Sequence, residues 1–145
     1  MKKTVALLTV ALLTAAGVAR ADGLDPIEIR QTGLDLLNGD FAGIKVALAA
    51  KGDLKTLEFP AQAIQRFAAL MPSLFPKGSE TGHNTKALPE VWSDQAGFQK
   101  AAANLGDAAG KLVVAVKVND ADAAAAAFKG VGEACGACHR TYRAK

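Results

Sequence analysis

The residues of this chain that are best suited to chemistry lie together near its C-terminal end. The only two cysteines, Cys135 and Cys138, are followed directly by His139, so the segment reads Cys-x-x-Cys-His. On a helix these three positions share one face. Two thiols at this spacing can add to the two vinyl groups of a haem, and the adjacent imidazole can then reach the iron as an axial ligand. The motif therefore predicts one covalently attached haem c, with His139 on the metal.

Three other uses of the motif account for fewer of its residues. A disulfide between Cys135 and Cys138 would close a very small loop and leave His139 without a role. A thioredoxin-like redox pair expects a preceding strand within a βαβ unit, and the sequence has no such pattern. A structural zinc site needs four ligands, and His83 is the only further histidine or cysteine in the chain.

Residues 1–21 have the organisation of a bacterial secretory signal peptide. The basic pair Lys2 and Lys3 precedes a continuous apolar stretch, and a small-x-small cleavage site, reading ARA, ends the segment. The alternative is a membrane anchor, which would need roughly 20 apolar residues, more than this stretch provides. We expect cleavage, a mature domain of residues 22–145, and export to a periplasm, where c-type haem is attached.

Composition and charge narrow the possible partners. The 145 residues carry 17 Lys and Arg against 14 Asp and Glu, a formal net charge of +3. Three of the basic residues lie in the expected signal peptide, so the mature domain would carry equal numbers of the two signs. We therefore expect neither nucleic acid nor an acidic membrane surface as a partner. Half of the residues are apolar and only 6% are aromatic, which favours helices over a β-sandwich.

The mature sequence predicts an all-α fold, an antiparallel four-helix bundle. Apolar residues recur at helical spacing in four segments: 25–50, 53–74, 93–116 and 120–142. Asp25 would cap the first helix and Ser93 the third. Pro60 must lie in the first turns of the second helix or kink it. The third and fourth segments are almost contiguous, so we expect them to be antiparallel neighbours.

Only six residues follow His139, so no later methionine can serve as a second iron ligand, as in small soluble cytochromes c. The chain resembles the cytochromes c′, the class II c-type cytochromes, in the segments CGACHRTYR, IRQTGL and PEVWSD. The resemblance implies a four-helix bundle around a five-coordinate, high-spin haem. It also implies binding of small diatomic gases (nitric oxide and carbon monoxide), electron transfer, and in many members a homodimer paired through the first two helices. The sequence specifies no redox partner.

Arg30 occupies a position on the first predicted helix where the periodicity calls for an apolar residue. A buried charge without a partner is costly, and a guanidinium suits a carboxylate. The resemblance implies that Arg30 contacts a haem propionate and that Gln31 adds a polar contact. The alternative is that Arg30 lies solvated at the edge of the bundle.

Leu34 lies one turn beyond Arg30, and the resemblance places it over the distal side of the iron. Leucine cannot ligate iron, which favours a five-coordinate metal whose distal face admits only small ligands. The alternative is a six-coordinate, low-spin electron-transfer cytochrome, in which Met71, the only methionine of the mature chain, would be the ligand; a mid-seam methionine is more typical of a core. A haem peroxidase needs a distal acid or base, which Leu34 is not, so we expect no enzyme and no catalytic residue.

Arg143 lies one helical turn beyond His139. The resemblance places it beside the proximal imidazole, where a cation would tune the iron potential; the alternative is a cation that only favours the helix C-terminus. Glu80 and Thr81 lie in the loop where members of the family add contacts to the haem edge. We expect His83, in the same loop, to be a solvated surface residue.

Overall fold

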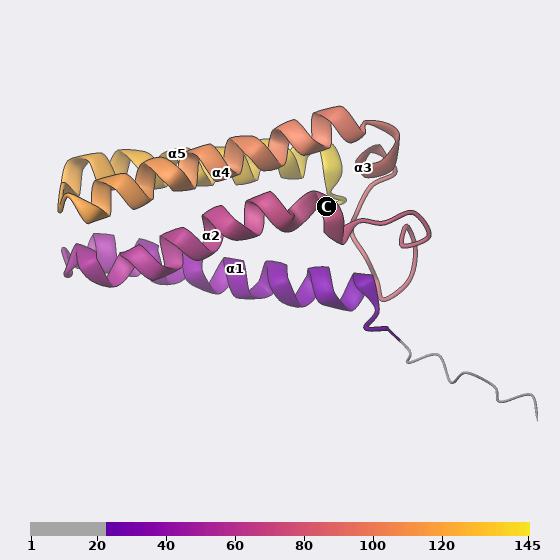
Figure 1. Cartoon of the computed structure of the whole chain (residues 1–145), viewed down its shortest axis with the longest axis horizontal. Coiled ribbons are helices and arrows are strands. Elements are labelled where there is room, and N and C mark those ends of the chain that lie inside the picture. The colour runs from indigo at the N-terminus through magenta and orange to yellow at the C-terminus, as the bar shows by residue number, and fades with distance from the viewer. Residues whose placement is uncertain (1–22) are drawn as a thin grey trace, which may run out of the picture.

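Four long helices lie side by side in the part of the chain that the structure describes, residues 23–145 of a computed structural model (Figure 1). The predicted signal peptide lies outside the described residues. The predicted antiparallel bundle is confirmed. Its four helices are α1 (Pro26–Ala49), α2 (Glu58–Leu70), α4 (Gln95–Lys117) and α5 (Ala121–Tyr142). A short helix, α3 (Glu90–Ser93), follows the long loop and precedes α4.

Three of the four long helices begin after an aspartate, whose side chain accepts a hydrogen bond from a backbone N–H of the first turn. Asp25 accepts from the N–H of Ile27 at 2.6 Å, with Pro26 as the first helical residue, as predicted. Asp120 caps α5 in the same way. The predicted cap of the third helix is wrong: Ser93 ends α3, and Asp94 caps α4 instead.

The second predicted helix is divided into three parts by its prolines. The turn η1 (Leu54–Leu57) precedes α2, and the turn η2 (Met71–Leu74) follows it. Pro60 lies in the first turn of α2, where its missing N–H is tolerated. Pro72 has no N–H to continue the α-helical ladder, so the chain tightens into η2 there.

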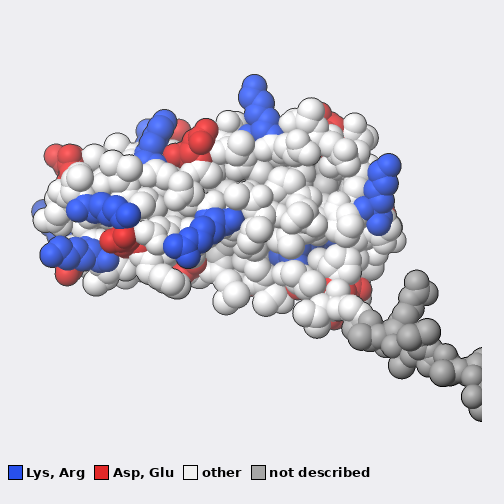
Figure 2. All heavy atoms as spheres, viewed as in Figure 1, with Lys and Arg blue, Asp and Glu red and all other residues white. Residues whose placement is uncertain are grey.

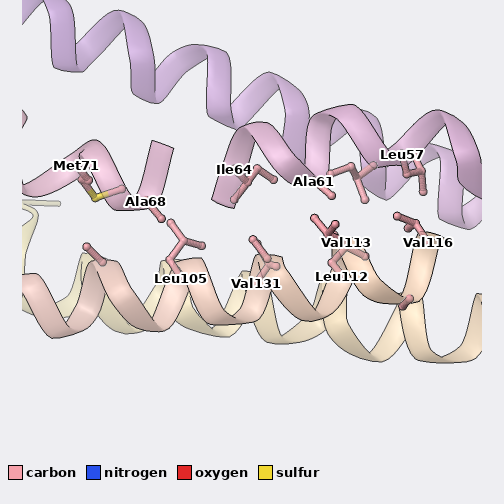
Figure 3. Close-up of a cluster of buried hydrophobic side chains, with 14 of the residues drawn as sticks. Leu57, Ala61, Ile64, Ala68, Met71, Leu105, Leu112, Val113, Val116 and Val131 are labelled. Carbon is pink, nitrogen blue, oxygen red and sulfur yellow. The ribbon is translucent and has the colours of Figure 1, made fainter. Parts of the chain in front are cut away.

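The core lies mainly between α2 and α4 (Figure 3). Leu57, Ala61 and Ile64 of α2 and its preceding turn face Leu112 and Val116 of α4. α4 buries eight residues, whereas α1, α2 and α5 bury three each, and one of those of α1 is charged. The helix α4 therefore contributes most of the core.

The helices α1 and α2 approach closely at the segment IRQTGL, one of the three segments that carry the family resemblance. A Cβ at Gly33 would lie 2.8 Å from Cζ of the Phe67 ring, so a larger residue there would displace this ring. Leu34 is the next residue of α1.

On the face shown in Figure 2, most of the acidic side chains lie next to basic ones, and broad regions of that face carry no charge. Among residues 23–145, none of the helices combines the length and apolarity needed to cross a bilayer.

Candidate functional site

A cavity of about 820 Å³ opens between α1, α4 and α5 at the end of the bundle that carries the long loop. Its volume lies in the range of small-molecule and cofactor sites. Most of its wall is apolar, with Phe75, Phe98 and Leu105 among the lining side chains. The cavity can therefore hold a large, flat, mainly apolar group.

Cys135, Cys138 and His139 all line this cavity from the last turns of α5. Both cysteines are free thiols and are half-buried, so the structure contains no disulfide between them. Burial raises the pKa of both thiols, and the neighbouring Cys135 raises the pKa of Cys138 further. Two protonated thiols and one imidazole on one face match the donor set that covalent haem attachment requires.

The surroundings of His139 favour the neutral form of its imidazole. Burial lowers the pKa of His139, and the nearby cation of Arg143 lowers it further. Neutral imidazole is the form that ligates a metal. Within residues 23–145 no three His, Cys, Asp or Glu side chains form a group able to hold a bare metal ion, so the zinc alternative finds no ligand set there.

Arg30 is buried, with only 1% of its surface exposed, so it is not a solvated residue at the bundle edge. Its guanidinium donates to the hydroxyl and the carbonyl of Ser79, both at 2.7 Å, and to the hydroxyl of Thr85 at 3.0 Å. It also lies 4.6 Å from the centre of the Phe75 ring. Burial lowers the pKa of Arg30, while Asp25 acts in the opposite direction. Three of its five N–H groups hold the loop, and two remain for another acceptor.

The loop that Arg30 holds is also fastened to the start of α1 by His83. The imidazole lies 3.2 Å from a carboxylate oxygen of Asp25 and 3.4 Å from one of Glu28. Gln31 donates to the carbonyl of His83 at 2.9 Å. His83 is exposed, as predicted, but it also connects the loop to α1. Gly82, His83 and Asn84 all have positive φ, and this turn brings the imidazole back onto α1.

The remaining predicted residues divide between two hollows. Leu34 and Gln31 line the main cavity from α1, and Arg143 lines it from the end of α5. Glu80 and Thr81 line an adjoining hollow beside Trp92, which shares Ala87 with the main cavity, and the charge of Glu80 acts to raise the pKa of Arg30.

One segment of the cavity wall, residues 85–87, was not predicted from the sequence. Thr85, Lys86 and Ala87 line the cavity because the chain pairs there with the residues that follow α5. The N–H of Ala144 donates to the carbonyl of Lys86 at 2.8 Å. No local pattern in the loop signals this pairing, since its partner lies more than fifty residues away in the sequence.

Comparison with known proteins identifies the architecture. The family model described as Cytochrome C′ matches residues 25–143. The chain belongs to the cytochrome c′ family. Members of this family carry covalently attached haem c, and they are haem proteins that bind gases rather than enzymes. The predicted cofactor and the non-enzymatic assignment are therefore confirmed.

Individual cytochromes c′ match nearly over their whole length. The protein from Rubrivivax gelatinosus is 35% identical over 125 residues, covering 83% of this chain and 95% of the relative. A nitric oxide complex of a variant from Alcaligenes xylosoxidans superposes with a TM-score of 0.75 at 31% identity, covering 83% of this chain and 94% of the other. A cytochrome c′ described as having ligand-controlled dimer dissociation superposes with a TM-score of 0.77 at 30% identity, covering 83% and 95%.

Proposed function

We propose that this chain binds small diatomic gases at a five-coordinate, high-spin haem iron. One observation carries the proposal. The Cys135, Cys138 and His139 motif lines the cavity from α5, and the residue that faces it from α1 at the expected distal position is Leu34, which cannot ligate iron. The two cysteines would hold the haem as thioethers, and His139 would be its axial ligand. When bound, the iron supplies the coordination site for the gas.

The apolar side chain of Leu34 acts as a steric filter. It offers neither a hydrogen-bond donor nor a base, so the distal side discriminates by size and polarity rather than by chemistry. Leu34 is half-buried, on a helix that packs mainly against α2 and touches α5 only slightly, so it can move aside for a two-atom ligand. The nitric oxide complex of the related Alcaligenes xylosoxidans protein supports this class of ligand.

The polar ends of the haem would lie near Arg30 and Gln31. An N–H group of Arg30 that the loop does not use would donate to a propionate carboxylate, and the guanidinium is already held in place by Ser79 and Thr85. Lys86, on the same wall segment as Thr85, adds a cation at the cavity. Arg143 would lie on the proximal side, near His139.

The optical and electron paramagnetic resonance spectra of the purified holoprotein test the coordination state. We expect high-spin ferric and ferrous forms that take up carbon monoxide without displacing a protein ligand. A six-coordinate, low-spin spectrum would overturn the proposal. Met71 would then be the residue to replace first, because it also lines the cavity.

We infer that the mature domain, residues 22–145, works as an electron-transferring, gas-binding protein in the periplasm, after removal of the signal peptide. We further infer that it forms a homodimer through the outer side of α1 and α2. Three large apolar side chains there, Leu36, Val46 and Phe59, are between 68% and 74% exposed. A relative with ligand-controlled dimer dissociation supports pairing in this family. Sedimentation over a concentration series tests it, and a monomer at all concentrations would overturn it.

A further inference from the structure

The phenol of Tyr142 joins two helices at the cavity. Its hydroxyl donates to Oδ2 of Asp94 at 2.7 Å, and Oδ1 of the same carboxylate accepts from the N–H of Gly97 at 3.0 Å. One carboxylate therefore caps the start of α4 and also holds the end of α5. The contact connects the segments PEVWSD and CGACHRTYR, which lie 48 residues apart at these two side chains.

The backbone near Asp94 leaves just enough room for this contact. A Cβ at Gly97 would lie 2.5 Å from the phenol oxygen and even closer to the Asp94 carboxylate. Any larger residue at this position would displace one of the two partners. A glycine in the first turn of α4 is therefore a requirement of the Tyr142–Asp94 contact rather than of the helix.

The ring of Tyr142 is fixed as firmly as its hydroxyl. It packs edge-on against Phe98 with ring centres 5.2 Å apart, and Phe98 packs edge-on against Phe75 at 5.0 Å. Phe75 in turn lies against the guanidinium of Arg30. All four side chains line the cavity, so this row continues from the α5 wall to the α1 wall. The carbonyl of Tyr142 also accepts from the N–H of Leu88 at 3.0 Å.

The phenol remains a hydrogen-bond donor throughout the ordinary pH range. The hydrogen bond to Asp94, assisted by burial and by the negative charge of that carboxylate, raises the pKa of Tyr142 to about 12. By contrast, the structure shows no side-chain hydrogen bond to the imidazole of His139 among residues 23–145. The direction of that ring therefore depends on the helical turn that carries it.

We propose that Tyr142 is a positioning residue for the proximal histidine. Its bond to Asp94 fixes the last turn of α5 against the first turn of α4, and so sets the direction in which His139 presents its imidazole to the iron. Tyr142 is three residues after His139, on the same side of the helix. Groups that orient a metal-binding histidine change the strength of its bond to the metal. The inference rests on the proposed function only in taking His139 as the axial ligand.

Tyr142→Phe keeps the ring contacts and removes only the hydroxyl. In the ferrous holoprotein, resonance Raman spectroscopy gives the iron–histidine stretching frequency, and amide hydrogen exchange reports the opening of residues 139–144. We expect the stretching band to shift and broaden, and those amides to exchange roughly tenfold faster. Faster exchange with an unchanged band would overturn the proposal, because Tyr142 would then only stabilise the helix end.

Asp120 supplies a matched control for the loss of a helix cap. It caps α5 by accepting from the N–H of Ala123 at 2.9 Å, as Asp94 caps α4. Asp94→Ala should shift the stretching band as Tyr142→Phe does, and the double variant should shift it no further, since both changes remove one contact. Asp120→Ala should lower stability and leave the band in place. An equal shift in Asp120→Ala would overturn the proposal.

Failure of the proposed five-coordinate iron can be distinguished from failure of the role proposed for Tyr142. If the wild-type protein proved to be low-spin and six-coordinate, the orientation of His139 would be read from the electron paramagnetic resonance g-values of its ferric form. The same comparison of Tyr142→Phe with Asp120→Ala then decides the role of Tyr142. Unchanged g-values in Tyr142→Phe would overturn it independently of the ligand count.

Discussion

The two walls of the cavity are built in different ways. The α1 wall is fastened through polar side chains: Arg30 bonds to Ser79 and Thr85, and His83 lies between two carboxylates at the start of the helix. The α5 wall carries the cysteines and the histidine on a helix packed along α4, and its end is fixed by Tyr142.

A gas-binding haem site must hold the iron in place and also admit a ligand, and the two walls divide these tasks between them. The wall that would hold the iron is anchored at both its backbone and its side chains, which keeps the donor set in place. The wall that would face the incoming ligand, α1, packs mainly against α2 and touches α5 only slightly, whereas α5 packs extensively on α4. Segments with fewer packing contacts open at lower free-energy cost. We therefore expect ligand entry to involve α1 and the loop that Arg30 holds, rather than α5.

The largest expected effect on the α1 wall comes from removing its buried cation, Arg30. Arg30→Ala would leave the hydroxyl and the carbonyl of Ser79 without their donor and would empty the space against Phe75. We expect a loss of about 3 kcal/mol in the free energy of unfolding, measured by urea titration of the holoprotein.

Arg66 is the control for this prediction. It lies exposed on α2, where it bonds to Gln62 at 3.0 Å. Arg66→Ala should change the unfolding free energy by less than about 0.5 kcal/mol. Equal losses in the two variants would contradict the buried anchoring role of Arg30.

Leu34→Ala tests whether the α1 wall filters ligands. Removing the side chain should raise the association rate of carbon monoxide by roughly tenfold, equivalent to about 1.4 kcal/mol of activation free energy. Flash photolysis measures the rate. Leu48→Ala, a half-buried leucine at the far end of the same helix and outside the cavity wall, should leave it unchanged. A rate unaffected by Leu34→Ala would rule out the filter.

The outer side of α1 can be tested separately from its cavity side. Leu36→Glu places a charge among the exposed apolar side chains of the proposed dimer surface, and we expect it to weaken dimerisation at least tenfold in sedimentation equilibrium. Val114→Glu is the matched control, because Val114 is 63% exposed on α4. If both variants dimerise as the wild type does, the interface lies elsewhere.

The smallest expected effect concerns the α5 wall at high pH. The pKa of Tyr142 is raised from 10.0 to about 12 in the folded protein, so the folded state keeps its proton more tightly than the unfolded state. The stability that this contributes is fully present below pH 10 and is lost as the pH rises from 10 towards 12. Urea titrations across this range should show a steeper decline for the wild type than for Tyr142→Phe. Parallel declines would contradict the assigned hydrogen bond.

The sequence by itself determined the helices and the chemistry of the α5 wall. Cys135, Cys138 and His139 are close neighbours on one helix, so helical geometry alone places them on one face. Asp25 could be recognised as a cap because a cap bonds only two or three residues ahead. The same local pattern placed the cap of the third helix one residue early, at Ser93 instead of Asp94. The cofactor followed from the same short-range pattern.

Only the tertiary structure decided what surrounds that motif. The partners of Arg30 lie 49 and 55 residues away, and that of Tyr142 lies 48 residues away, so no local pattern could indicate them. The path of the loop depends on positive backbone φ angles at Gly82 and its neighbours. That path brings Thr85 to Arg30 and places Glu80 in an adjoining hollow. Helical periodicity predicts which side of a helix is buried, but the contacts between distant segments arise only when the loop is folded back.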